Sequence, residues 1–113
     1  MKNTRVTVLA AASILGAALL SGWSTAQTPT GDILQSALPT VGVDGTVQTI
    51  AAGSAAVGRC IAKTGTLDGV TNLAGYCHSR GRQLVAFALF VDGPPNWSAL
   101  TYIGRMVAAI ASY

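Results

Sequence analysis

The sequence predicts an α+β fold: an antiparallel β-meander of three strands with a C-terminal helix packed on one face. Three β-rich segments, residues 59–64, 71–78 and 83–91, are separated only by short turns, as is typical of neighbouring antiparallel strands. The segment from residue 97 to residue 112 repeats apolar residues at helical spacing. An uncharged apolar run near the N-terminus predicts a hydrophobic helix that precedes the sheet.

Length and composition restrict the chain to one domain and exclude one class of partner. With 113 residues, of which 50% are hydrophobic and 10% charged, the chain can build one core but not two. The net charge of +3 is not gathered into a run of Lys and Arg, and no basic patch alternates with aromatic residues. We therefore expect no nucleic-acid partner.

The first 26 residues have two interpretations. Basic residues precede the apolar run of residues 6–20, and small residues precede a cleavage site after Ala26. This pattern predicts a secretory signal peptide, or an uncleaved anchor that associates with a membrane through residues 6–23. The other interpretation is a core helix of a longer protein, because periodicity does not decide between the two. In either case we expect an exported protein, located in the periplasm, in the cell wall or on the outer face of the cytoplasmic membrane.

Residues 27–58 are predicted to form loops around one short helix. Asp32 is a suitable N-cap for a helix that reaches Ala37, and Pro39 would terminate it. Gly42-Val43-Asp44-Gly45 has turn chemistry.

The meander is predicted from turns and apolar runs. Asp68 and Gly69 lie between the first two strands, and residues 79–82 form the next tight turn. The third strand, residues 83–91, is almost wholly apolar, which predicts burial on both faces.

Asn96 is a suitable N-cap for the last helix. One apolar stripe is expected to face the sheet. Its members are Trp97, Leu100, Ile103, Val107 and Ile110.

Pairing of the first two strands about residues 68–69 brings Cys60 opposite Cys77. The pair forms either a disulfide, as exported proteins permit, or two buried thiols that pack as small apolar groups. His78 lies beside Cys77, but one histidine and two cysteines are too few for a structural zinc site. We expect neither a metal nor a cofactor.

The most informative motif is the Lys-Thr-Gly triplet at residues 63–65. On a strand edge, this triplet is the third signature of penicillin-recognising serine acyl-transferases. The other two signatures, Ser-x-x-Lys and Ser-x-Asn, do not occur in these 113 residues. The alternative interpretation of Lys63 is an exposed lysine that protects the edge of a sheet.

A longer string surrounds the triplet. LPTVGVDGT at residues 38–46, AKTGTL at 62–67, LAGY at 73–76 and LVAF at 84–87 occur in that order. The string resembles the C-terminal part of the D-alanyl-D-alanine carboxypeptidase/endopeptidase family often called penicillin-binding protein 4, peptidase family S13. The resemblance is good from about residue 31 to residue 113 and faint before it. It implies that residues 27–113 are the C-terminal part of a carboxypeptidase domain with the penicillin-binding transpeptidase or β-lactamase-like fold.

The resemblance also implies a chemistry. Members of the family act by acyl transfer through a serine ester on cell-wall stem peptides ending in D-Ala-D-Ala, and β-lactams acylate the same serine. The substrate-binding residues implied here are Lys63, Thr64, Gly65 and Thr66. The ammonium and hydroxyls would bind the substrate carboxylate, Gly65 would leave room for the substrate backbone, and the N–H of Thr66 would be an oxyanion-hole donor.

Catalysis by these residues alone is not expected. The lysines are Lys2 and Lys63, and neither lies three residues after a serine, so the nucleophile and its partner lysine are expected upstream in a longer protein. Four of the serines are considered as nucleophiles and have no candidate base nearby in sequence, namely Ser36, Ser54, Ser79 and Ser98. The leading hypothesis is a truncated carboxypeptidase without turnover. The alternatives are an exported module that binds peptidoglycan peptides without catalysis, and a membrane-anchored interaction protein.

Overall fold

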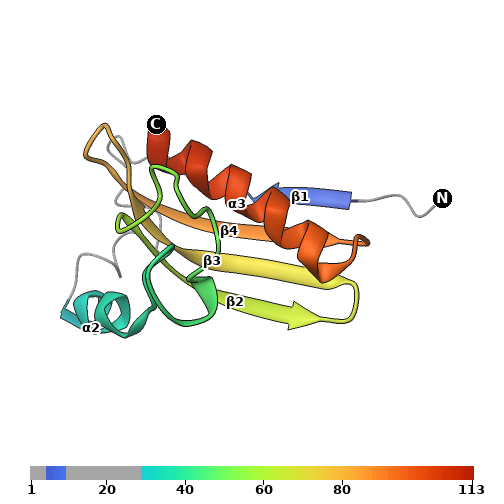
Figure 1. Ribbon diagram of the computed structural model, residues 1–113. Helices are drawn as coiled ribbons and strands as arrows, with labels where there is room; N and C mark the ends of the chain where they lie inside the picture. Colours follow the sequence, from blue (N-terminus) through green and yellow to red (C-terminus); the bar gives the residue numbers. More distant parts are fainter. Residues whose placement is uncertain (1–4, 10–28) are drawn as a thin grey trace.

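The computed structural model describes residues 5–9 and 29–113, which form a sheet with a helix laid across it (Figure 1). The sheet has the order β1-β4-β3-β2, with every neighbouring pair antiparallel. The elements in chain order are β1 (Arg5–Leu9), α2 (Pro29–Ala37), the 3-10 helix η1 (Gly45–Val47), β2 (Cys60–Leu67), β3 (Val70–His78), β4 (Leu84–Asp92) and α3 (Asn96–Ser112).

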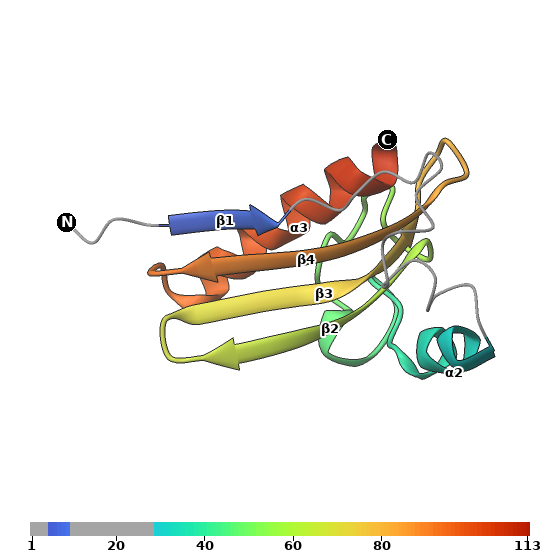
Figure 2. The same cartoon turned by 180° about the vertical axis from the view of Figure 1, so that it is seen from behind.

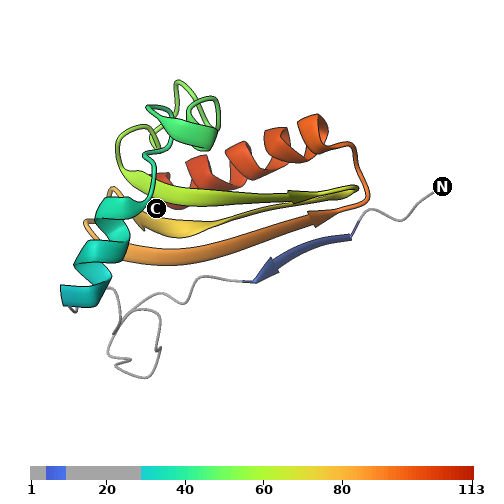
Figure 3. The same cartoon turned by 90° about the horizontal axis from the view of Figure 1, so that it is seen from below.

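The predicted meander with a C-terminal helix on one face is confirmed. Strands β2, β3 and β4 follow one another, and α3 lies on one side of the sheet (Figure 3). Gly69 turns the chain between β2 and β3 with a φ of 72°, a conformation that glycine adopts at no steric cost. Strand β2 continues to Leu67, past the expected end at Thr64. The whole segment of residues 63–66 therefore lies inside a strand.

A strand lies where the sequence analysis expected the beginning of a hydrophobic helix. β1 pairs with β4, from Arg5 opposite Asp92 to Leu9 opposite Ala88. The short sequence RVTVL is rich in β-branched residues, which favour a strand, and β4 offers it an unpaired edge. The rest of the expected helix and the cleavage site after Ala26 lie outside the described residues, so the signal peptide or anchor stays a prediction. Within the described ranges, no helix has the length and apolarity needed to cross a bilayer.

The core lies between the sheet and α3. Alternate residues of β3 and β4 point toward the helix, and the largest fully buried side chains among them are those of Leu73 and Leu89. The face of the sheet opposite α3 is seen in Figure 2. Phe90 lies on it and is 40% exposed. The prediction that residues 83–91 are buried on both faces is therefore wrong for the described structure, because only one face of β4 has a helix packed on it.

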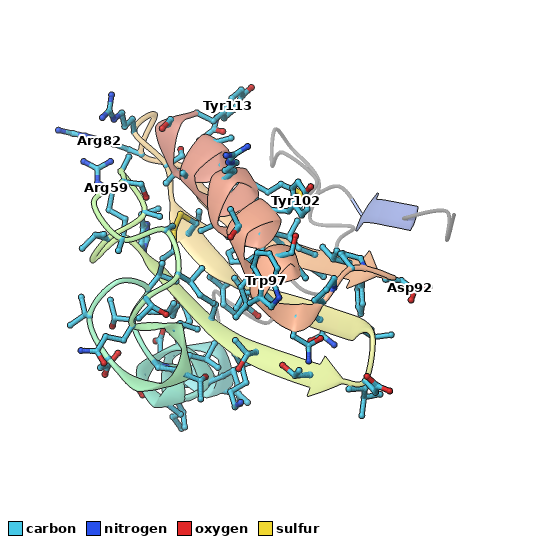
Figure 4. The ribbon with its side chains drawn as sticks, turned by 45° about the vertical axis from the view of Figure 1, so that its right-hand side comes forward. Arg59, Arg82, Asp92, Trp97, Tyr102 and Tyr113 are labelled. Carbon is cyan, nitrogen blue, oxygen red and sulfur yellow. A yellow bond between two sulfur atoms is a disulfide. The ribbon has the colours of Figure 1, made fainter. Side chains whose placement is uncertain are left out.

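The buried stripe of α3 is narrower than predicted. Ile103 and Val107 are fully buried as expected, but Trp97 is 75% exposed and projects from the outside of the helix (Figure 4). Small residues take the places closest to the sheet, since Ala99 and Ala111 are fully buried. A large side chain would hold the helix away from the sheet at these positions.

Both predicted N-caps are wrong. Helix α2 begins at Pro29, which places Asp32 inside its first turn. Pro95 occupies the N-cap position of α3, and the Asn96 side chain instead accepts a hydrogen bond from the Thr71 hydroxyl at 3.0 Å. Asn96 therefore links the helix to β3.

Cys60 and Cys77 form a disulfide, with an S–S distance of 2.03 Å. They lie directly opposite each other in β2 and β3, and both are fully buried. The adjacent N–H of His78 donates to the carbonyl of Arg59 at 2.9 Å, so the cysteines occupy a non-hydrogen-bonded position, where opposed side chains are closest. The structure thus selects the bridge over the pair of thiols.

We predict that reduction of the disulfide lowers the free energy of unfolding by about 3 kcal/mol, because the closed loop no longer restricts the unfolded chain. Urea unfolding with and without dithiothreitol measures this loss. The double variant Cys60→Ala/Cys77→Ala is the control and should not respond to the reductant. An equal stability of the oxidised and the fully reduced wild type, with the state of each verified by mass, would contradict the prediction.

We also predict opposite outcomes for two large apolar residues of α3. Ile103→Ala should cost about 2–5 kcal/mol of stability because it leaves a cavity under the helix. Trp97→Ala should change stability by less than about 0.5 kcal/mol because the ring is exposed. Thermal and urea unfolding of both variants measure the difference, and a larger loss for Trp97→Ala would show that the stripe is wrongly assigned.

Candidate functional site

Strand β2 forms one edge of the sheet, and only the first half of that edge is covered. The N–H of Val41 donates to the carbonyl of Cys60 at 2.8 Å, and the N–H of Ala62 donates to the carbonyl of Pro39 at 3.0 Å. From residue 63 to residue 67, no described segment forms backbone hydrogen bonds with the outer side of β2. The Lys-Thr-Gly triplet therefore lies where the edge opens.

The backbone hydrogen bonds on the covered half of β2 show which residues of the open half direct their N–H and C=O groups away from β3. Cys60 and Ala62 direct their backbone groups outward, and backbone direction alternates along a strand. Thr64 and Thr66 consequently direct their N–H and C=O groups outward at the open edge. The role of the Thr66 N–H as an oxyanion donor stays a prediction, and its position at the edge is compatible with that role.

The four predicted binding residues are divided between the two faces of the sheet. Thr64 and Thr66 share the face of the buried Ala62, whereas Lys63 and Gly65 lie on the opposite face. The Lys63 ammonium returns to the edge and donates to the carbonyl of Thr64 at 3.0 Å. The positive charge therefore lies at the outward carbonyl of Thr64.

Two further residues approach the predicted site. The hydroxyl of Thr64 donates to the hydroxyl of Thr46 in η1 at 2.9 Å. Asn72 of β3 lies directly opposite Gly65. Thr46 belongs to the string GVDGT, which carried no role for it. The hairpin centre that brings Cys60 opposite Cys77 also brings Asn72 opposite Gly65, but the sequence does not show that the Asn72 side chain lies against Gly65.

Three of the four serines considered in the sequence, Ser36, Ser54 and Ser79, use their hydroxyls in local hydrogen bonds. Ser36 donates to the carbonyl of Ile33 at 2.8 Å. The hydroxyl of Ser54 accepts from the N–H of Ala56 at 3.1 Å, and that of Ser79 accepts from the N–H of Gln83 at 3.3 Å. These hydroxyls stabilise local backbone. In the part of the chain that the structure describes, no group of three His, Cys, Asp or Glu residues is placed to hold a metal ion.

A groove of about 540 Å³ lies elsewhere on the molecule. Residues 49–54 form one wall, and Trp97, Gly104 and Arg105 of α3 contribute to the other. None of residues 63–66 lines it. The candidate site is therefore an open strand edge and not a cavity.

Comparisons with known proteins identify the family and the fold. Residues 3–113 match the sequence profile of the D-Ala-D-Ala carboxypeptidase 3 (S13) family. The fold is similar to a crystal structure of penicillin binding protein 4 from Haemophilus influenzae, with a TM-score of 0.65 and 26% sequence identity over 80% of this chain. A second crystal structure of that protein, in complex with a novel β-lactam, matches with a TM-score of 0.66, again at 26% identity over 80% of this chain. The chain spans 22% and 23% of the lengths of these two structures. No curated protein sequence matches it.

We predict that Lys63→Val increases self-association. An open edge that carries a β-branched apolar residue in place of a charge is a template for pairing with another copy, and the variant also frees the carbonyl of Thr64. Sedimentation velocity over a range of concentrations should show larger species at concentrations where the wild type shows none. Arg105→Val, which removes an exposed charge from α3, is the control; equal association of the two variants would contradict the prediction.

Proposed function

The chain belongs to the D-Ala-D-Ala carboxypeptidase 3 (S13) family, and on that premise we propose that the open edge of β2 binds peptides ending in D-Ala-D-Ala. The observation that supports the proposal is the Lys63 ammonium at the outward carbonyl of Thr64, on an edge where residues 64 and 66 have no backbone partner among the described residues. Peptidoglycan stem peptides are the substrates that family membership suggests.

Binding would begin with backbone pairing. An extended peptide that adds to the open half of β2 becomes a further strand of the sheet, with its hydrogen bonds made to the outward groups of Thr64 and Thr66. These groups have no backbone partner among the described residues. The peptide would therefore gain hydrogen bonds without displacing any that the described strands make to one another.

The end of the peptide would be recognised by charge. The Lys63 ammonium now donates to an uncharged carbonyl, and a carboxylate is a stronger acceptor for it. The exposed hydroxyl of Thr66 makes no hydrogen bond with another described residue, so it is available as a second donor. The Thr64 hydroxyl would exchange its bond to Thr46 for one to the carboxylate.

We propose that the 113 residues bind without turnover. Acyl transfer in this family requires a serine activated by a base, and neither Ser-x-x-Lys nor Ser-x-Asn occurs in the sequence. A β-lactam would accordingly bind to the edge reversibly and leave no covalent adduct. The chain would act as the substrate-binding wall of a carboxypeptidase.

The buried disulfide between Cys60 and Cys77 supports an exported location, because such bridges persist in oxidising compartments. It also supports the second candidate function, an exported module that binds peptidoglycan peptides without catalysis. The alternative of a membrane anchor through residues 6–23 competes with strand β1, because residues 5–9 pair with β4 in the sheet. A membrane-bound and a released form are distinguished by washing membranes with alkaline carbonate.

The test is a titration of the ¹⁵N-labelled chain with an acylated tripeptide ending in D-Ala-D-Ala, followed by amide NMR. We predict shifts at residues 63–67 at millimolar peptide. Lys63→Gln should weaken binding about tenfold, because a charge-assisted hydrogen bond is lost. Arg105→Gln is the matched control and should bind as the wild type does.

The same samples distinguish binding from catalysis. A tripeptide ending in L-Ala-L-Ala should bind more weakly, and no D-Ala should be released from the D-Ala peptide. An absence of shifts at the β2 edge would remove the binding proposal, whereas release of D-Ala by the purified chain would remove the proposal that it lacks turnover.

A further inference from the structure

Gly65 is a glycine for a spatial reason and not for a conformational one. Its φ is not among the positive values adopted by six other glycines, so an L-residue could adopt its backbone conformation. A Cβ atom built on Gly65 would lie 2.5 Å from Oδ1, 2.9 Å from Nδ2 and 3.0 Å from Cγ of Asn72. The carboxamide of Asn72 therefore lies over the α-carbon of Gly65 and occupies the space where a side chain would be.

The carboxamide of Asn72 makes no hydrogen bond with the side chains or backbone of the described residues. Its polar atoms are also not buried. Among the described residues, the one buried side-chain polar atom without a partner is Oε1 of Gln83. The neighbouring hydroxyls of Thr71 and Thr64 both donate within the molecule. Asn72 thus keeps two N–H donors and one carbonyl acceptor free beside the candidate site.

The carboxamide and the Lys63 ammonium lie on the same face of the sheet. Lys63 and Gly65 alternate with Thr64 in β2, so both are directed to the face opposite α3. The ammonium reaches the carbonyl of Thr64 at the open edge. The carboxamide extends from β3 over the α-carbon of Gly65, which follows Thr64 in β2. A ligand at this edge would meet both groups from one side.

We propose that Asn72 is a substrate-contacting residue, whose Nδ2–H donates to the C-terminal carboxylate of a peptide paired with β2. This inference rests on the proposed function, because it assumes that a peptide binds to that edge. Two oxygens of a carboxylate accept several hydrogen bonds, so the ammonium and the carboxamide can bind one carboxylate together. Gly65 is then required indirectly, since any larger residue would displace the carboxamide from the face of β2.

The test compares Asn72→Ala and Asn72→Asp with the wild type in the NMR titration. The probes are the acylated D-Ala-D-Ala tripeptide with a free carboxylate and its C-terminal carboxamide analogue. Asn72→Ala should weaken binding of the free acid about fivefold to tenfold and leave the weaker binding of the carboxamide analogue unchanged. Asn72→Asp should weaken the free acid further, because a second carboxylate faces the ligand. Gln48→Ala, which removes an exposed carboxamide elsewhere, should bind as the wild type does.

Two outcomes would overturn the inference in different ways. If the amides of Thr64 and Thr66 shift and Asn72→Ala binds both peptides as the wild type does, the role of Asn72 fails and the proposed function stands. If no amide of the wild type shifts with either peptide, the proposed function fails and the inference fails with it.

The packing of Asn72 on Gly65 is tested without a ligand. Gly65→Ala should lower the urea midpoint of unfolding, because the new methyl group meets the carboxamide. Adding Asn72→Ala should restore most of that loss, whereas adding Gln48→Ala should restore none. A double variant Gly65→Ala/Asn72→Ala that is as unstable as Gly65→Ala would overturn the inference that Gly65 makes room for Asn72.

Discussion

The register between β2 and β3 is the constraint on which the other features depend. Side chains alternate strictly along a strand, so a slip by one residue would exchange the two faces of β2 and direct Lys63 toward the core under α3. Two features oppose such a slip. The disulfide joins Cys60 to Cys77. Position 75 requires glycine in this register, because a Cβ atom there would overlap the carbonyl oxygen of Ile61.

The two halves of β2 differ in burial and in backbone pairing. Its first residues, Cys60 and Ala62, are fully buried, are paired on both sides, and belong to the core. Its last residues, Thr66 and Leu67, are exposed and paired on one side only. One strand therefore has a rigid half that anchors it and an open half that offers backbone groups. A loop could offer the same groups, but it would not hold them at fixed spacing.

The parts of this fold that the sequence predicted are those with local signals. The Asp68-Gly69 turn, the apolar run of β4 and the periodicity of α3 predicted the meander and its helix. The position of Cys60 opposite Cys77 followed from the centre of the first hairpin. The bridge itself did not follow, because a pair of buried thiols has the same sequence.

The errors occurred where the outcome depends on neighbours in space. The apolar run of residues 6–20 predicts a helix, whereas the pairing of β1 with β4 that the structure shows involves residues more than 75 positions apart. Trp97 was placed on the buried stripe because periodicity ranks apolar residues by spacing and not by the room beneath them. Among the site residues, the four in the motif could be identified from sequence. Asn72 could not, because the predicted register places it opposite Gly65 but does not show that its carboxamide lies over the α-carbon of Gly65.

The segment that covers the first half of β2 has a consequence for the length and direction of any added strand. Residues 39–41 already pair with the edge, in an antiparallel bridge between Thr40 and Ile61. Residues 63–67 offer about 16 Å of free edge, at roughly 3.3 Å per residue. A chain that adds antiparallel to them runs toward Ala62 with its carboxyl end leading, and there it meets residues 39–41. A free terminus fits against that barrier, whereas a continuing chain would have to leave the plane of the sheet. The covering segment thus acts as a stop that makes a general strand-pairing edge selective for the ends of chains.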